Sequence, residues 1–295
     1  MNMPKLHITN REKIKAPEQK ISSNPLINKV MSYLSFGIET ILGVNNALEV
    51  EQISYISPVQ TRFPENNIGK FRHYKAESDS SVLIFPQRGE GYNFAQLLSM
   101  YLASNGINAY EVETPLRSSR LPSKVKSMSE LDLSIEDLVN IGQQAVSEGQ
   151  GIITEMNESM KATAGISLGG IYSSILYGID NRLTSACLMV TGGNLKQMVT
   201  QSEDALAKSL CDYSNLDYLN YIDPCFYTNP GKAGSLLMIN AKYDRDVLQE
   251  NGYELAISWG EPNTIYIRAG HLSAVKNIFH MFPEIKNHFE KTLGK

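Results

Sequence analysis

Hydrophobic and polar residues follow two strand-like patterns along this chain. In residues 48–56 and 70–75, apolar and polar side chains alternate, which is typical of strands with one solvent-facing side. A turn-rich stretch at 58–69 separates them, so together they predict an antiparallel pair. Later apolar runs are short and continuous, which indicates strands buried on both faces. These runs lie at residues 81–86, 109–112, 162–166, 185–190, 235–240 and 264–268.

Helical spacing of apolar residues fills most of the chain between these runs. The clearest case is 135–160, with Ser134 as the N-cap and two acidic residues, Glu136 and Asp137, in the first turn. Further helices are expected at 26–44, 94–104, 168–177 and 273–293. Buried strands that alternate with helices predict an α/β fold, in which a mostly parallel sheet carries helices on both faces. Reactive groups in such folds lie on loops beyond the carboxyl ends of strands.

Composition and charge narrow the classes of partner. The chain has 295 residues and a formal net charge of −4, which argues against nucleic acid as the main partner. No apolar run is long enough to span a membrane, and the polar segment 1–20 lacks the apolar centre of a secretory signal. Three widely spaced cysteines, Cys187, Cys211 and Cys225, predict free thiols in a reducing cytoplasm and no metal site. We expect a flexible arm at 1–24 and one domain at 25–295.

The strongest chemical signal is the sequence Gly165-Ile166-Ser167-Leu168-Gly169. It follows a short run of small and apolar residues and precedes a helical pattern, so it predicts a strand, a sharp turn with Ser167 at its apex, and a helix. Glycine two residues to either side avoids a side-chain collision across the turn, and Gly170 would let the helix approach the sheet. The alternative interpretation is an ordinary strand-to-helix loop.

A serine hydroxyl needs a base, and His271 is the histidine best placed to act as one. It directly follows the last expected strand, whereas the other four histidines lie in the arm, in an early strand or in the final helix. An acid that orients the imidazole should follow the strand at 235–240. Asp244 is favoured because it lies nearer the strand end. Asp246 is the alternative and is expected to cap the next helix, and Asp223 is expected to be a turn residue.

This order of serine, aspartate and histidine resembles the α/β-hydrolase superfamily over residues 48–293. The Ser167 elbow, the Asp244 loop and the Gly270-His271 loop match the nucleophile, acid and base positions of that family. The resemblance implies an eight-stranded, mostly parallel sheet. Within the superfamily, residues 239–244 and 269–271 are similar to the dienelactone-hydrolase-like and prolyl-oligopeptidase-like branches.

The resemblance also predicts an oxyanion hole. Its first donor would be the N–H of Leu168, and its second would come from the loop after residue 86. Many family members carry His-Gly there, whereas this chain has Pro86-Gln87, which makes the N–H of Arg88 the expected donor and that of Gln87 the second choice. Among the side chains we expect to contact the substrate are Gln87, Tyr92 and Asn194.

Residues 195–229 are longer than a normal connection and rich in leucine and tyrosine. In the α/β-hydrolase fold such an insertion commonly covers the site, so we expect a small cap whose aromatic residues line an acyl or aromatic pocket. The same pattern also describes a helix that packs on the core, and both interpretations stay open.

The sequence thus predicts a serine hydrolase that cleaves a carboxylic ester or thioester of a small-molecule substrate through an acyl-enzyme on Ser167, without a cofactor. An amide substrate is less favoured. The alternative is a protein with the same fold that uses the pocket for binding, or for a lyase or isomerase reaction on a metabolite. Homo-oligomerisation and the binding partner of the helix at 26–44 are left open.

Overall fold

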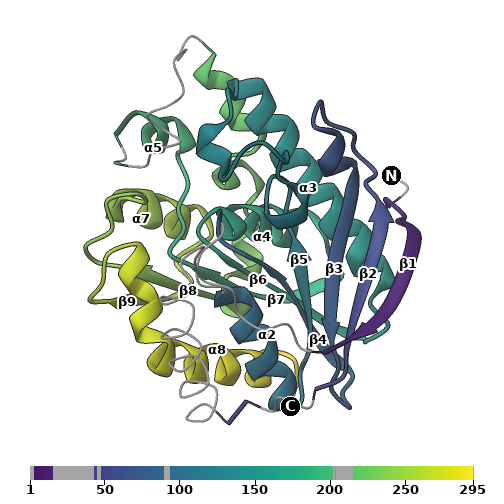
Figure 1. The fold of residues 1–295 in the computed structure, drawn as a ribbon. Helices are drawn as coiled ribbons and strands as arrows, with labels where there is room; N and C mark the ends of the chain where they lie inside the picture. Colours follow the sequence, from purple (N-terminus) through teal and green to yellow (C-terminus); the bar gives the residue numbers. More distant parts are fainter. Residues whose placement is uncertain are drawn as a thin grey trace, which may run out of the picture.

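A mixed β-sheet runs through the centre of the molecule (Figure 1). The computed structural model describes residues 3–15, 43–44, 48–89, 94–201, 203 and 215–294. Within these residues nine strands pair in the order β1-β2-β3-β5-β4-β6-β7-β8-β9. The strands are β1 (His7–Ile14), β2 (Val50–Ile56), β3 (Ile68–Tyr74), β4 (Ser80–Phe85), β5 (Asn108–Glu113), β6 (Met160–Ile166), β7 (Leu183–Met189), β8 (Leu236–Ala241) and β9 (Asn263–Ile267).

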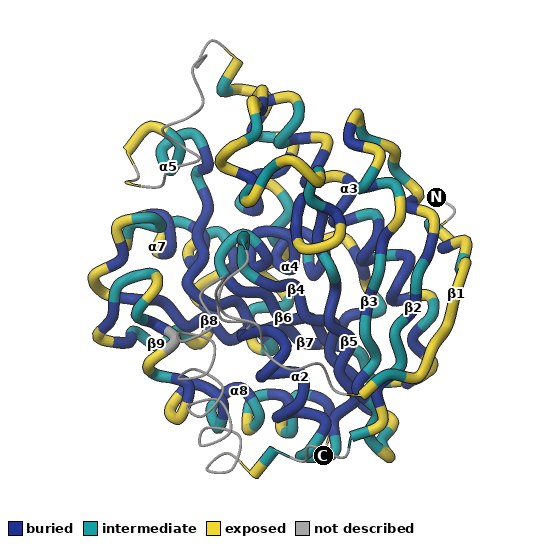
Figure 2. Tube along the Cα trace, viewed as in Figure 1, coloured by how far each residue is buried: buried dark blue, intermediate teal, exposed yellow. Residues whose placement is uncertain are grey.

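The direction of the strands divides the sheet into two parts. Neighbours among β4 to β9 pair in parallel. Strands β1, β2 and β3 instead form antiparallel pairs, and β3 joins β5 in the same way. The central strands are dark blue in Figure 2, and every residue of β4 and β8 is buried. Continuous burial explains why both strands are mostly apolar instead of alternating. The parallel pairings confirm the predicted mostly parallel α/β sheet.

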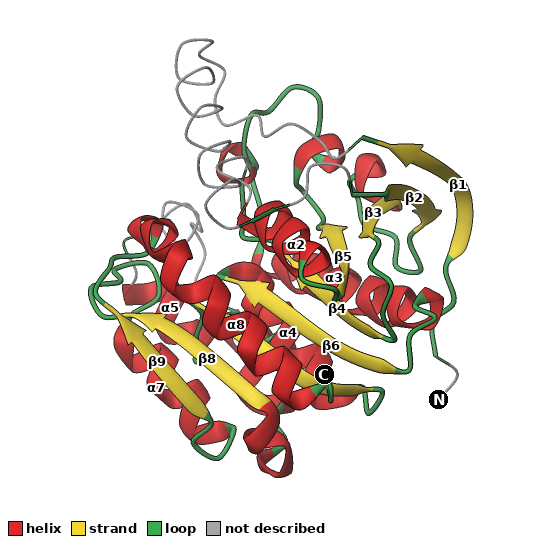
Figure 3. Cartoon of the chain, turned by 90° about the horizontal axis from the view of Figure 1, so that it is seen from below, coloured by secondary structure: helices red, strands yellow, loops and turns green. Residues whose placement is uncertain are grey.

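Helices cover both faces of the sheet (Figure 3). The α-helices of the described residues are α2 (Phe94–Ser104), α3 (Ile135–Glu155), α4 (Leu168–Ile179), α5 (Leu195–Gln201), α7 (Gln249–Ser258) and α8 (Ile278–Thr292). One apolar core lies under α2 and α8, where Phe94 and Phe282 contact edge to face. A second core lies under α3, α4 and α7 and contains Leu176, Leu255 and Trp259. None of these helices is long and apolar enough to cross a membrane.

Helix α3 shows how local sequence sets its ends. Its N-cap is Ser134, as predicted, and a capping box forms because the Asp137 carboxylate accepts the Ser134 N–H while the Ser134 hydroxyl accepts the Asp137 N–H. The helix ends at Glu155 instead of continuing to residue 160. Residues 157–159 connect the helix to β6, and the N–H of Ser159 donates to the Asp79 carboxylate at 2.8 Å. This bond joins residues 80 positions apart, so a contact with the segment before β4 fixes the chain after the helix.

Strand β1 corrects two expectations. Residues 7–14 pair with β2 instead of forming part of a flexible arm, and they raise the sheet from the expected eight strands to nine. The strand lies at the sheet edge and exposes most of its side chains, so its sequence lacks the alternation that marks a half-buried strand. Leu6 packs against Gly151 of α3, and Arg11 donates to Glu155 at 2.9 Å. Backbone pairing and these contacts hold the segment in place.

Short 3-10 turns connect the main elements. They are η1 (Pro64–Asn67), η2 (Ser118–Arg120), η3 (Met128–Glu130), η4 (Leu216–Tyr221), η5 (Pro224–Tyr227), η6 (Pro230–Ser235) and η7 (Leu272–Asn277). The helix expected at 26–44 lies outside the described residues except for 43 and 44. Part of the insertion expected at 195–229 also lies outside them, at residue 202 and at 204–214.

Candidate active site

Ser167 occupies the sharp turn between β6 and α4, as predicted. Its backbone has φ 54° and ψ −119°, a conformation that residues other than glycine rarely adopt. The end of β7 holds this conformation from both sides. The Ser167 N–H donates to the Met189 carbonyl at 2.9 Å, and the Thr191 hydroxyl donates to the Ser167 carbonyl at 2.9 Å. A single threonine after a strand carries no sequence signal, so Thr191 could not be predicted.

The glycines of the elbow are required by its close contacts. A Cβ on Gly165 would lie within 3.0 Å of the Gly169 carbonyl, and a Cβ on Gly169 would collide with the carbonyls of Phe85 and Pro86. A Cβ on Gly170 would lie 2.6 Å from the side chain of Thr191. The first turn of α4 therefore packs directly against the loop that follows β4, which lies beside β6 in the sheet.

His271 lies in the loop after β9, and its Nε2 atom is 2.8 Å from the Ser167 Oγ atom. The two residues are 104 positions apart in the sequence. Backbone bonds fix the loop: the Tyr243 N–H donates to the Ala269 carbonyl at 2.9 Å, and the Gly270 N–H donates to the Ser273 hydroxyl at 2.9 Å. The imidazole is thereby held over the serine, with 15% of its side chain exposed.

Asp244 completes the constellation from the loop after β8. Its Oδ2 atom lies 2.7 Å from His271 Nδ1, and its side chain is only 2% exposed. The other oxygen, Oδ1, accepts the N–H groups of Asp246 at 3.0 Å and Val247 at 2.9 Å. Because an ionised carboxylate can only accept, Nδ1 of the imidazole carries a proton and Nε2 is left to accept the serine proton. The structure thus brings all three predicted residues together.

The structure separates Asp244 from the two alternative acids. Asp246 was expected to cap the following helix, but the N-cap of α7 is Leu248 and no side-chain bond caps it. Asp223 is a turn residue, as predicted: its carboxylate accepts the N–H groups of Leu195 at 2.7 Å and Cys225 at 3.0 Å.

The expected oxyanion donors lie on the two segments that meet at the elbow. Leu168 is the first residue of α4. Arg88 lies in the loop after β4, followed by Gly89 with φ +82°. Burial raises the pKa of Tyr172 in α4, and the positive charge of Arg88 opposes this shift. The donor role of both N–H groups stays a prediction.

The residues expected to contact substrate have different positions. Gln87 is half-buried in the loop after β4, and Tyr92 lies outside the described residues. Asn194 has φ 55°, and its side-chain oxygen accepts the Gln197 N–H at 3.3 Å at the start of α5. This local bond gives the Asn194 side chain a structural role, and substrate contact at this position stays a prediction.

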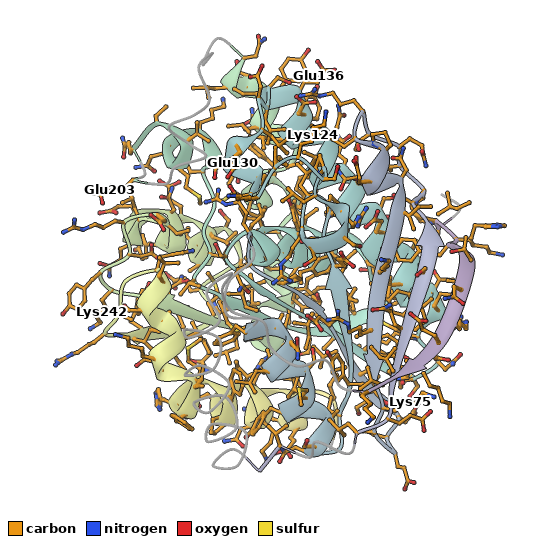
Figure 4. The ribbon with its side chains drawn as sticks, in the orientation of Figure 1. Lys75, Lys124, Glu130, Glu136, Glu203 and Lys242 are labelled. Atoms are coloured by element: carbon orange, nitrogen blue, oxygen red, sulfur yellow. The ribbon has the colours of Figure 1, made fainter. Side chains whose placement is uncertain are left out.

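The described part of the insertion at 195–229 shows packing on the core, and the cap role stays a prediction. Met198, Leu216 and Leu219 pack on the core under α3 and α4, which supports the core-packing interpretation for these residues. Tyr221 and Phe226 are instead 59% and 66% exposed. Within this insertion, Glu203 lies beside the loop after β8, where its N–H donates to the Arg245 carbonyl at 2.9 Å. Its side chain extends outward, as does that of Lys242 in the loop after β8 (Figure 4).

Two of the three cysteines can be described, and both are free thiols. Burial raises the pKa of Cys187 well above its usual range and raises that of Cys225 to about 11. Both thiols therefore stay protonated at neutral pH, which makes them poor nucleophiles. Cys211 lies outside the described residues. No group of three His, Cys, Asp or Glu side chains in the described part of the chain is arranged to hold a metal ion.

No protein-family model and no curated protein sequence matches this chain. Solved structures do resemble it. An acylaminoacyl peptidase from Pyrococcus horikoshii superposes with a TM-score of 0.64 at 12% identity, over 88% of this chain and 44% of the peptidase. This chain therefore spans less than half the length of that peptidase.

Two esterases match over nearly their whole length. The Pyrococcus furiosus esterase has a TM-score of 0.56 at 11% identity, over 86% of this chain and 96% of the esterase. A cold-adapted esterase from an Arctic intertidal metagenomic library has a TM-score of 0.52 at 15% identity, over 83% and 94% of the two chains. At these identities the likeness concerns architecture. This chain therefore has the α/β-hydrolase fold.

Proposed function

We propose that this protein is a serine hydrolase that cleaves a carboxylic ester or thioester of a small molecule through an acyl-enzyme on Ser167. The observation that carries the proposal is the unbroken chain of hydrogen bonds from Ser167 Oγ to His271 Nε2 and from His271 Nδ1 to Asp244 Oδ2. The three side chains come from loops after β6, β9 and β8, at the edge of the sheet where this fold places reactive groups.

The geometry defines a role for each residue. Ser167 Oγ attacks the carbonyl carbon as its proton passes to His271 Nε2, which later returns the proton to the departing alcohol or thiol. Asp244 keeps the imidazole in the required tautomer and stabilises its protonated form. The N–H groups of Asp246 and Val247 hold the Asp244 carboxylate in place, so that the carboxylate does not have to reorient during the reaction. Water, activated by the same histidine, then releases the acyl group.

Two N–H groups are proposed to stabilise the oxyanion that forms during attack. The Leu168 N–H lies at the start of α4, where the first N–H groups of a helix have no intrahelical acceptor. The Arg88 N–H belongs to the loop packed against that helix turn through Gly169. Loss of one such donor typically lowers kcat by about 10² to 10³.

The preference for an ester rests on the comparisons and on leaving-group chemistry. Two esterases share this fold over 94% and 96% of their chains, whereas the acylaminoacyl peptidase has more than half of its chain outside the match. An ester or thioester also needs less assistance to expel its leaving group than an amide does, so the site described here is sufficient for it. An amide substrate is the alternative outcome of the experiment.

The test measures hydrolysis of p-nitrophenyl esters of increasing acyl length, and labelling by a fluorophosphonate, for the wild type, Ser167→Ala and Ser123→Ala. Ser123 is an exposed serine on the long loop after β5 and provides the matched control. Hydrolysis and labelling are expected in the wild type and the control, and a loss of about 10⁴-fold or more in Ser167→Ala. Activity that survives in Ser167→Ala would contradict the serine mechanism. Absence of labelling in the wild type would favour a non-hydrolytic role.

A further inference from the structure

A buried arginine contacts the loop that carries the proposed oxyanion donor. Arg117 follows β5 and is only 6% exposed. Its Nε–H donates to the Gly89 carbonyl at 3.0 Å. Gly89 directly follows Arg88, and its φ of +82° turns the backbone at this point. The guanidinium of Arg117 is thus bonded to the carbonyl of the residue that directly follows Arg88, whose N–H is proposed to meet the oxyanion.

The backbone around Arg117 is held in an uncommon conformation. Leu116 has φ 55° and Ser118 has φ 49°, so left-handed residues flank the arginine on both sides. Residues other than glycine stay in this region only where their surroundings fix them. One such contact is the bond from the Leu116 N–H to the Asn66 side-chain oxygen at 2.8 Å.

A second, fully buried arginine, Arg120, anchors the same loop shortly after Arg117. Both Arg120 and Glu148 have side chains that are 0% exposed, and two parallel hydrogen bonds of 2.7 Å join them. Arg120 also donates to the Glu113 carbonyl at 2.8 Å, at the end of β5. Glu148 accepts a further bond from the Tyr55 hydroxyl at 3.1 Å. The loop that bears Arg117 is therefore bonded to β2, β5 and α3, and these contacts hold the backbone of Arg117 in a fixed position.

We propose that Arg117 is a positioning residue for the oxyanion hole: it holds the loop after β4 so that the Arg88 N–H stays aimed at the reacting carbonyl. The proposal rests on the serine hydrolase function proposed above and adds a residue to its machinery. It also accounts for the missing His-Gly sequence, because this chain supplies from a neighbouring loop the support that fixes its donor. Arg117 acts through Gly89 and does not itself need to contact the substrate.

The experiment compares Arg117→Ala with Arg182→Ala, a matched control. Arg182 is a half-buried arginine that also bonds a neighbouring oxygen: it donates to Asp180 at 2.9 Å after α4, at the opposite end of that helix from the elbow. Arg117→Ala is expected to lower kcat on a p-nitrophenyl ester by about 10- to 100-fold with less than about a threefold change in KM. Added guanidinium is expected to restore part of kcat. Hydrogen exchange in the peptide at 83–89 is expected to rise, and the control should change none of these.

The outcomes separate this proposal from the proposed function. A wild type that hydrolyses the ester, with wild-type kcat in a folded Arg117→Ala, would overturn the positioning role alone. So would a loss of kcat without increased exchange at 83–89. If the alanine variant does not fold, Arg117→Met, which keeps the apolar stem of the side chain, carries the same expectation and the same refutation. A wild type without hydrolysis and without fluorophosphonate labelling at Ser167 would overturn the serine hydrolase function itself, and this proposal with it.

Discussion

Replacing Asp244 by asparagine changes the charge of the side chain while keeping its shape, and the structure predicts how the new amide would sit. Oδ1 of the carboxylate accepts two backbone N–H groups, from Asp246 and Val247. The amide oxygen must stay at that position, because an NH2 group there would face two donors. The NH2 group of the asparagine would then point at Nδ1 of His271. Nδ1 would become an acceptor, Nε2 would carry the proton, and Ser167 would lose its base.

The size of the effect follows from the cost of turning the amide the other way. That orientation would leave two half-buried N–H groups without an acceptor, at up to about 1–3 kcal/mol each, or about 2–6 kcal/mol together. At about 1.4 kcal/mol per tenfold change, the inactive tautomer is favoured by between about 30-fold and about 10⁴-fold. We therefore expect Asp244→Asn to lower kcat by up to about 10⁴-fold, the size of loss seen when a triad imidazole is held in the wrong tautomer.

The assay is steady-state hydrolysis of a p-nitrophenyl ester, with melting temperatures measured in parallel. Asp246→Asn is the matched control, because it removes a carboxylate two residues away that does not bond the imidazole and should leave kcat within about threefold of the wild type. Two results would refute the reasoning: an Asp244→Asn variant that keeps more than a tenth of its activity, or an Asp246→Asn variant that loses as much as Asp244→Asn.

Three further predictions concern the elbow, the buried ion pair and pH. Gly169→Ala should abolish ester hydrolysis and fluorophosphonate labelling, because its Cβ would collide with two backbone carbonyls; normal labelling would contradict this. Glu148→Gln leaves the buried Arg120 charge unpaired and should lower the free energy of unfolding, measured in urea, by about 3–5 kcal/mol. The control Glu136→Gln, on the exposed surface of α3, should change that free energy by at most about 1 kcal/mol. Burial lowers the pKa of His288 in the folded protein, so below about pH 6.5 the unfolded chain binds more protons than the folded chain and the free energy of unfolding should decrease. Denaturant titrations at pH 7 and pH 5 should show a smaller decrease for His288→Gln than for the wild type.

Much of the fold can be predicted from the sequence, because buried strands and helices have a characteristic spacing of apolar residues. The strand predicted at 81–86 and the helix predicted at 94–104 agree closely with β4 and α2, since most of their residues are buried and apolar. Strand β1 could not be predicted in the same way. It lies at the sheet edge with most side chains in solvent, so backbone pairing with β2 forms it and the side chains leave little periodicity.

In the candidate site, too, local sequence identifies some residues, and only the three-dimensional structure identifies the others. Ser167 and His271 could be predicted because a local motif and a position after a strand identify them. The choice between Asp244 and Asp246 required the structure, since both follow β8 within a few residues. Asp244 is identified by the distance of 2.7 Å between its Oδ2 atom and His271 Nδ1. Arg117 could not be found from sequence, because its bond to Gly89 joins residues 28 positions apart. No local pattern encodes such a contact.

The 104-residue separation between Ser167 and His271 also bears on how the protein folds. The loops that carry the serine, the acid and the base follow β6, β8 and β9, and the sheet places these strands together only after the parallel pairings of β7 with both of its neighbours have formed. Parallel pairings close long loops of chain before they gain contacts, which makes them slow steps. We therefore expect the hydrogen bond between Ser167 and His271 to form late during refolding from denaturant. A segment that ends before β9 lacks His271, however well its remaining strands assemble.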